Sequence, residues 1–342
     1  MNSNNHIKEF KPTRIFLSMR NIVLLVDKDS KAWDFAKKIK YYIETNKQEY
    51  VKIVNVPIGL FRNGELRFDS PSNLRKKDVY YIQDSSKEPQ KWWVELLLIR
   101  DLVLSSSANS LTFILPNLLY SRQDRKDKSR VPISARALAN SISSGVKKII
   151  TMDLHARQIQ GFYPPTTPLD NLHSFSETVK YLIKNHFDYL DNLLILSPDA
   201  GGVTRAKSFL TRIEKHTQKK CEIAFVIKER SAPGEVGKTR YVGPDPAGKN
   251  VLIVDDIIDS GGTLCSTSKL LKEKGVNKII CYATHGLFTK GISELKENFD
   301  LILTSNTHYR ENNDIKIIDM SPVFAEAIFR AQKGFSISEL FE

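Results

Sequence analysis

The sequence predicts an α/β protein of two tandem domains, each a largely parallel sheet flanked by helices. Short apolar runs alternate with amphipathic stretches of helical length, which is the pattern of βα units. The chain has 342 residues, more than one typical domain holds. A stretch rich in turn formers, 153–172, interrupts the alternation, which then restarts. We therefore expect two α/β domains that join near Asp170.

Each expected element follows from its local pattern. Strands are expected where mostly apolar residues stand together between turn formers, and helices where apolar residues recur at helical spacing. In the first half the expected strands are 21–26, 78–83, 111–115 and 147–152, and the expected helices are 30–45, 90–104 and 131–144. In the second half the expected strands are 192–196, 223–227, 251–254 and 278–282, and the expected helices are 176–185, 204–215 and 264–274.

Composition limits the class of protein. A hydrophobic share of 41% and a charged share of 26% are typical of a soluble globular protein. No apolar run reaches ~18 residues, so we expect no membrane span. The formal net charge is +12, yet the basic residues are scattered and no aromatic and basic RNA-binding module is present. We therefore favour small polyanionic substrates over nucleic acid as the binding partners.

Cysteine use and the N-terminal segment indicate the compartment. Cys221, Cys265 and Cys281 form no CxxC pair, so neither a disulfide framework nor a zinc site is expected. This favours a reducing compartment, and we expect a cytoplasmic protein. Residues 1–20 hold no apolar core of a secretory signal, and we expect them to form a disordered extension.

The most informative segment is VLIVDDIIDSGGTL at 251–264. Its four leading apolar residues indicate a buried parallel strand, and ligands bind at the carboxyl ends of such strands. Gly261 and Gly262 let backbone N–H groups approach a phosphate without a side chain in the way. Ser260 and Thr263 add hydroxyl donors, and the start of the following helix favours an anion.

The acidic residues of this segment have a different use. Asp255 and Asp256 repel a phosphate, but they suit the hydroxyls of a sugar or its Mg²⁺. The segment therefore predicts a phosphate-binding turn beside a sugar-hydroxyl site, as ribose 5-phosphate requires. The alternative is an ordinary strand–turn–helix connection whose acids cap the helix.

Two other segments carry candidate chemistry. Seven of the eleven residues in 120–130 are charged. Such a run is usually a solvated loop, but a flexible basic arm also suits a triphosphate. His155 follows an expected strand end and has Asp153 nearby, so it is a candidate metal ligand, although a lone histidine is more often structural.

Several segments, taken together and in order, resemble the motifs of one enzyme family. Beside the segment 251–264, these are FRNGE at 61–65, YSRQDRKDKSRVPISA at 120–135, TMDLHARQIQGF at 151–162, SPDAGGVTRA at 197–206, KER at 228–230 and ATHGLF at 283–288. With this set, the chain resembles the class I PRPP synthetases, or ribose-phosphate pyrophosphokinases, from about residue 21 to residue 342. Type I phosphoribosyltransferases share only the segment 251–264.

The resemblance implies two tandem domains of the type I phosphoribosyltransferase kind. An ATP-side domain would span 21–170, with 322–342 returning to it, and a ribose 5-phosphate-binding domain would span 171–321. The implied reaction is Mg²⁺-dependent transfer of pyrophosphate from ATP to the C1 hydroxyl of ribose 5-phosphate, with AMP released, for nucleotide biosynthesis. The implied assembly is a homo-hexamer activated by inorganic phosphate, without nucleic acid or membrane partners.

The resemblance also implies roles for single residues. The ATP-binding residues would be Phe61, Asn63, Glu65, Arg122, Gln123 and Asp127. The ribose 5-phosphate-binding residues would be Asp255, Asp256, Asp259, Ser260, Gly261, Gly262 and Thr263. The metal ligands would be His155 and Asp199, with Asp153 and Asp170 as further candidates. The catalytic residues would be Lys228 and Arg230, ahead of a flexible loop at 231–246. A regulatory phosphate would be held by Arg75, Arg130 and Ser336.

Two alternatives remain beside an active synthetase. A non-catalytic, PRPP-synthetase-like regulatory subunit would be expected to break the catalytic set, and here Lys228, Arg230 and His155 are all in place. A phosphoribosyltransferase that consumes PRPP would have no use for the charged arm at 120–130. We therefore expect a PRPP-forming enzyme.

Overall fold

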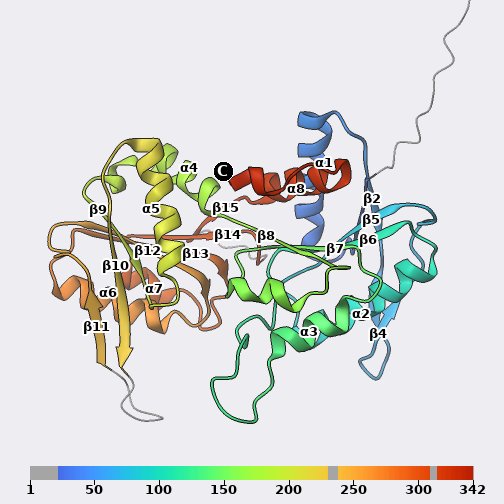
Figure 1. Ribbon diagram of the computed structural model, residues 1–342, viewed down its shortest axis with the longest axis horizontal. Helices are drawn as coiled ribbons and strands as arrows, with labels where there is room; N and C mark the ends of the chain where they lie inside the picture. Colours follow the sequence, from blue (N-terminus) through green and yellow to red (C-terminus); the bar gives the residue numbers. More distant parts are fainter. Residues whose placement is uncertain (1–21, 230–237, 309–313, 342) are drawn as a thin grey trace, which may run out of the picture.

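The computed structural model describes residues 22–229, 238–308 and 314–341, and the fold is given for these ranges. One large sheet lies in each half of the molecule, and the long helices pack on the faces of the sheets (Figure 1). The expected class, two tandem parallel sheets flanked by helices, is confirmed.

The first sheet has six parallel strands in the order β2-β1-β5-β6-β7-β8. Its strands are β1 (Ile22–Val26), β2 (Val51–Asn55), β5 (Asp78–Ile82), β6 (Ser110–Leu115), β7 (Lys148–Met152) and β8 (Leu169–Leu172). Its helices are α1 (Ala32–Lys47), α2 (Pro89–Ser105), α3 (Ser134–Ile142) and the short η1 (Arg157–Phe162). A separate hairpin pairs β3 (Ile58–Leu60) with β4 (Leu66–Phe68).

The second sheet has the order β11-β10-β9-β12-β13-β14-β15, and its edge strand β11 runs antiparallel to β10. Its strands are β9 (Leu193–Ser197), β10 (Glu222–Glu229), β11 (Lys238–Val242), β12 (Asn250–Ile258), β13 (Lys278–Gly286), β14 (Leu301–Ser305) and β15 (Lys316–Ile318). Its helices are α4 (Phe175–Asn185), η2 (Phe187–Leu190), α5 (Val203–Thr217), α6 (Gly262–Glu273) and α7 (Ser293–Asn298). The chain ends with α8 (Ser321–Lys333) and η3 (Ser338–Phe341).

The middle of the second sheet is a topological switch point. From β9 the chain passes outward to β10, and from the neighbouring β12 it passes outward in the other direction to β13. Helix α5 packs on the face that carries Leu252 and Val254, and α6 packs on the face that carries Val251 and Ile253. The loops that leave β9 and β12 therefore diverge, and a crevice for ligands opens at their carboxyl ends.

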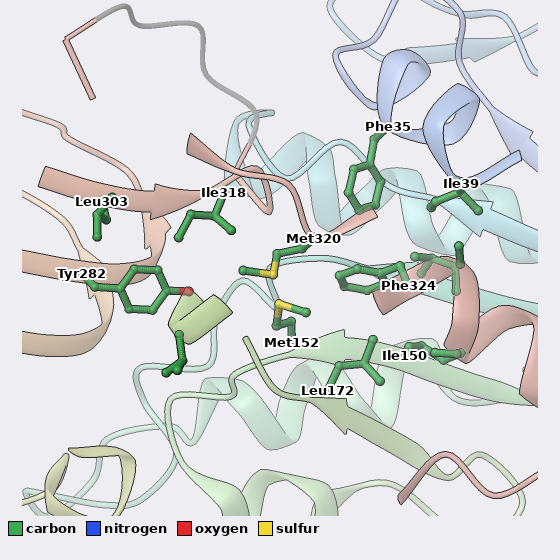
Figure 2. Close-up of a cluster of buried hydrophobic side chains, with 14 of the residues drawn as sticks. Phe35, Ile39, Ile150, Met152, Leu172, Tyr282, Leu303, Ile318, Met320 and Phe324 are labelled. Carbon is green, nitrogen blue, oxygen red and sulfur yellow. The ribbon is translucent and has the colours of Figure 1, made fainter. Parts of the chain in front are cut away.

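One hydrophobic cluster joins the two sheets. Figure 2 shows Met152 of β7 and Leu172 of β8 in the same cluster as Tyr282 of β13. Phe324 of α8 belongs to this cluster and meets Phe35 of α1 edge-on, with 5.4 Å between ring centroids. Helix α8 thus returns to the first helix of the chain, and shared apolar packing fixes one sheet against the other.

The acidic end of β12 differs from the expectation. The strand expected at 251–254 continues to Ile258, because β13 runs beside it and pairs with it as far as Gly286. Asp255 and Asp256 therefore lie inside the strand rather than after it. Helix α6 begins at Gly262, earlier than expected, so the connecting turn is short.

The segment after β10 is also different. The flexible loop expected at 231–246 contains strand β11, because the chain folds back along β10 and pairs Val242 with Phe225. Residues 230–237 lie outside the described ranges. Strands β2, β3, β4, β8, β14 and β15 were not expected. Strand β8 lies in the stretch 153–172, which its turn formers indicated to be a connection.

Within the described ranges, no helix combines the length and the apolar character that crossing a bilayer requires.

Candidate functional site

A cleft of about 630 Å³ lies where the carboxyl ends of strands from both sheets meet. The first sheet contributes the segment after β7, and the second sheet contributes the end of β12 and the first turn of α5. The charged lining residues include Asp153, His155, Arg157, Asp199, Arg205, Asp255 and Asp256. The cleft therefore occupies the switch point at which open α/β sheets bind ligands.

Asp153 joins the end of β7 to β13 beside this cleft. One of its carboxylate oxygens accepts from Thr284 Oγ1 at 2.7 Å and from Ser174 Oγ, and the other accepts from His173 Nδ1 at 3.2 Å. Burial acts to raise the pKa of Asp153, but the hydrogen bond and charge of His173 outweigh it and lower the pKa to about 2. Asp153 is thus an ionised carboxylate whose oxygens are already used by protein donors.

His285 of β13 makes a second buried contact with the end of β7. Its Nε2 donates to the carbonyl oxygen of Met152 at 3.1 Å, since a carbonyl can only accept. Its Nδ1 lies 2.8 Å from Thr307 Oγ1. Burial lowers the pKa of His285, which keeps the imidazole neutral.

A chain of charges runs from His155 to the acidic end of β12. His155 Nδ1 donates to Asp256 Oδ2 at 2.8 Å, and Arg205 Nη1 lies 3.2 Å from Asp256 Oδ1 and 3.6 Å from Asp255 Oδ1. Burial acts to raise the pKa of Asp256, but Arg205 and His155 lower it below its ordinary value. Burial and the charge of Asp256 raise the pKa of Asp255. With Nδ1 held by Asp256, His155 has Nε2 left for a ligand.

The turn between β12 and α6 offers backbone donors to an anion. Gly261 has a φ of +81°, and a Cβ there would lie 3.0 Å from the side chain of Leu295, so the position requires glycine. A Cβ on Gly262 would meet only Ser260 Oγ within 4 Å, at 3.8 Å, so the space beside it is open. The N–H groups of the first turn of α6 favour an anion in that space.

A second turn, after β9, lies next to the first because β9 and β12 are neighbours. Asp199 Oδ1 accepts from the N–H of Gly202, the residue just before α5, at 2.9 Å and so closes the turn. A Cβ on Gly202 would lie 2.5 Å from Ser197 Oγ, so this turn also requires glycine. Asp199 is exposed and lines the cleft.

The residues expected to hold adenine lie at the tip of the β3–β4 hairpin. The N–H of Phe61 donates to the carbonyl of Glu65 at 2.8 Å, and Asn63 Oδ1 accepts from the N–H of Glu65 at 3.2 Å. The Phe61 ring is 53% exposed, which leaves a face on which a base can stack. The hairpin brings these three residues together, although they do not line the cleft.

The charged arm meets the turn between β12 and α6. Arg122 Nη1 lies 2.6 Å from Asp259 Oδ2, and the two residues are 137 positions apart in the sequence. Thr289 Oγ1 donates to the other carboxylate oxygen of Asp259 at 2.8 Å. The hydrogen bonds from Thr289 and Arg122 lower the pKa of Asp259. The structure thus places Arg122, expected to bind ATP, in contact with Asp259, expected to bind ribose 5-phosphate.

One metal candidate lies away from the cleft, and two ATP candidates lie in the charged arm at 120–130. Asp170 forms an ion pair with Lys148 Nζ at 2.6 Å near the amino ends of β8 and β7, and it does not line the cleft. Because the cleft is at the carboxyl ends, the structure does not bring Asp170 to His155. The backbone carbonyl of Gln123 accepts from the N–H of Ala135 at 3.3 Å, and Asp127 is exposed.

The three candidates for the regulatory phosphate site do not come together within the described part of one chain. Arg75, Arg130 and Ser336 are exposed, and no hydrogen bond or ion pair joins any two of them in the described ranges. Lys228 lies in β10, where its backbone pairs with Thr239 of β11. Arg230 lies outside the described residues.

Comparisons with known proteins decide the family. The N-terminal domain model of ribose phosphate pyrophosphokinase matches residues 26–145, and the phosphoribosyl transferase domain model matches residues 166–321. A ribose-phosphate pyrophosphokinase of Cereibacter sphaeroides is 36% identical over 316 residues, which cover 90% of this chain and 91% of that protein. The chain belongs to the ribose-phosphate pyrophosphokinase family.

Two further matches agree with this family. The ribose-phosphate pyrophosphokinase A of Dictyostelium discoideum is 38% identical over 294 residues, covering 83% of this chain and 89% of that protein. A crystal structure of phosphoribosylpyrophosphate synthetase from Mycobacterium smegmatis superposes with a TM-score of 0.79 at 27% identity, covering 92% of this chain and 99% of that one. The resemblance found in the sequence is confirmed, and the protein is an enzyme.

The donor set of the cleft fits Mg²⁺. Mg²⁺ is usually bound through one or two carboxylates, and waters and substrate phosphates complete its shell. Among the described residues, no three His, Cys, Asp or Glu side chains are placed to hold a metal by themselves. Asp153 is occupied by protein donors, whereas Asp199 is exposed in the cleft and His155 has Nε2 left. A site that needs substrate oxygens is therefore consistent with this arrangement.

Sequence reasoning missed Arg205. Its side chain is 17% exposed and lies between the two carboxylates at the end of β12. A signal was present, because two adjacent acids in a buried strand require a cation nearby. Arg205 lies in the segment 197–206, which already carried part of the resemblance. In this pyrophosphokinase, Arg205 and His155 together favour the ionised form of Asp256.

We predict that Arg205→Ala destabilises the protein by about 3–5 kcal/mol, because it leaves buried carboxylates without their cation. Arg205→Lys keeps a charge and loses less. The measurement is denaturant unfolding, with Lys207→Ala, an exposed position on the same helix, as the control. Equal losses of stability in Arg205→Ala and Lys207→Ala would show that the pairing has no energetic role.

Proposed function

We propose that the protein makes 5-phosphoribosyl 1-pyrophosphate by transferring pyrophosphate from ATP to the C1 hydroxyl of ribose 5-phosphate, with Mg²⁺ required and AMP released. The observation that carries this proposal is the 2.6 Å contact between Arg122 and Asp259. It joins a polycationic arm suited to a triphosphate to a turn suited to a sugar phosphate. An enzyme that transfers a group between those two substrates needs both features at one cleft.

The ribose 5-phosphate side is supported by the arrangement of charge and space. The open space at Gly262 and the N–H groups of α6 favour the 5-phosphate. Asp255, whose pKa is raised, and the ionised Asp259 offer both a donor and an acceptor to sugar hydroxyls. Asp256 is held by Arg205 and His155 and therefore serves as the rigid support of this edge.

The ATP side is supported by the hairpin and by the arm. The exposed ring of Phe61 offers a stacking face, and Asn63 and Glu65 offer polar groups to the base edge. His155 Nε2 and Asp199 are the residues that would hold Mg²⁺, which supplies neutralisation of the phosphate charge when bound. The arm and the cleft residues align the triphosphate with the ribose.

The transfer depends on the orientation of the two substrates and needs no covalent enzyme intermediate. The C1 hydroxyl oxygen bonds to the β-phosphorus, the bond from that phosphorus to the α,β-bridging oxygen breaks, and AMP leaves with the electron pair. The hydroxyl proton is lost to solvent or phosphate. Negative charge builds on the transferring group, so cations aimed at it supply most of the acceleration.

The proposed reaction is tested by its products. With MgATP, ribose 5-phosphate and phosphate present, we expect equal amounts of AMP and PRPP, and no product after chelation of Mg²⁺. ADP in place of AMP would mean transfer of the γ-phosphoryl group and would overturn the proposal. Binding of both substrates without turnover would instead favour the non-catalytic regulatory subunit.

Lys228 and Arg230 are the proposed cations of the transition state, on the strength of the family motif. We predict that Lys228→Ala and Arg230→Ala each lower kcat by about 10³-fold, because an interaction made only in the transition state is lost. Lys220→Ala, an exposed lysine just before β10, is the control. A raised KM with unchanged kcat would make both residues ordinary binding groups.

Regulation by phosphate is proposed to act between subunits. Arg75, Arg130 and Ser336 are exposed and separate within one chain, so an anion site built from them needs more than one copy. We predict that inorganic phosphate raises activity and ADP lowers it, in a homo-hexamer, because phosphate would bind only the assembled state. A phosphate titration in phosphate-free buffer with light scattering tests this. Full activity of a monomer without phosphate would contradict it.

A further inference from the structure

The end of the chain packs into the structure next to the cleft. Helix α8 ends at Lys333 with Gly334 as its C-cap, and the chain leads on to η3, with its end drawn between α4 and α8 (Figure 1). Ile337, Leu340 and Phe341 are partly buried against the hydrophobic cluster shared by the two sheets. The last described residues are therefore part of the packed structure.

Phe341 is fixed at both its ring and its carbonyl. The ring meets His173 edge-on, with 5.1 Å between centroids, and Phe175 at 6.3 Å. His173 and Phe175 stack on each other at 5.4 Å, and the guanidinium of Arg212 lies 5.2 Å from the Phe175 ring centroid. Arg212 Nη2 also donates to the carbonyl of Phe341 at 2.8 Å. These contacts form one cluster, which we call the aromatic clamp: His173, Phe175, Arg212 and Phe341.

The aromatic clamp reaches the cleft through His173. His173 and Phe175 line the cleft, and His173 Nδ1 donates to Asp153. Asp153 directly follows β7 and begins the segment that carries His155. Edge-to-face and stacked rings hold each other in defined orientations, so loss of the Phe341 ring removes one of the two aromatic neighbours that orient the His173 imidazole.

We propose that Phe341 is a positioning residue of the cleft, which acts by holding His173 in the orientation that donates to Asp153. The C-terminal ring thereby sets the geometry of the segment after β7. This inference rests on the proposed function only for its effect on turnover, because the effect on the clamp itself is independent of the reaction.

The first test measures the structure alone. Amide hydrogen exchange is followed in peptides that cover 151–157 and 169–175, in the full chain and in Phe341→Ala. We expect loss of protection in both peptides in Phe341→Ala and wild-type protection in Phe341→Tyr, which keeps the ring. The matched control is Phe335→Ala, since that ring is 57% exposed and meets Phe329 at 6.1 Å. Unchanged protection in Phe341→Ala would overturn the proposal.

The second test measures kinetics on the same variants. We expect kcat/KM of PRPP formation to fall about tenfold in Phe341→Ala, as for a small misplacement of reacting groups, and to stay within about twofold in the other two variants. Should Phe341→Ala not fold, Phe341→Leu replaces it, because it keeps the apolar volume without the ring. Altered exchange in a chain whose wild type forms no PRPP would refute the proposed function and leave the positioning role intact. An equal kinetic loss in Phe335→Ala would refute the positioning role.

Discussion

Two buried hydrogen-bond contacts to the end of β7 determine where everything else in the cleft lies. Thr284 and His285 are neighbours on β13, and they bond to Asp153 and to the carbonyl of Met152. Hydrophobic packing holds the two sheets together, but it is not directional and does not by itself set the positions of the polar groups at the cleft. The two buried hydrogen-bond contacts hold the end of β7 in one position relative to β13, because a lost partner would leave a buried charge or carbonyl unsatisfied. The cleft between the two sheets is therefore preorganised.

Charge within the cleft follows from the same constraint. Two adjacent carboxylates enter a buried strand end, where like charges cannot both be ionised without a cation. Arg205 and His155 hold one of them, Asp256, in the charged form, and Asp255 is left with a raised pKa. The same edge therefore offers a fixed ion pair for support and a titratable acid for a sugar hydroxyl. Its backbone donors, one turn later, remain available to a phosphate.

The sequence predicted the α/β class, the two parallel sheets and the family, because these depend on local periodicity and on contiguous motifs. It did not predict that β12 continues through Asp255, since that extension depends on pairing with β13. It named Asp153 and Asp170 as further candidate metal ligands, and it did not predict their contacts with Thr284 and Lys148. Partners that lie far along the chain are set by packing, and a single sequence does not display them. Which expected residues bind substrate remains a prediction.

The central claim is that the turn after β12 binds ribose 5-phosphate and not the nucleotide. Calorimetry on Asp259→Asn, with each ligand titrated separately, tests it most directly. Because a hydrogen bond to a charged group is replaced by a weaker neutral one, we expect ribose 5-phosphate affinity to fall by about tenfold or more. The affinity for ATP should stay within about twofold, since Asp259→Asn changes no group of the hairpin and Arg122 keeps its charge for the triphosphate. An equal loss of affinity for both ligands would place the nucleotide at this turn and contradict the account.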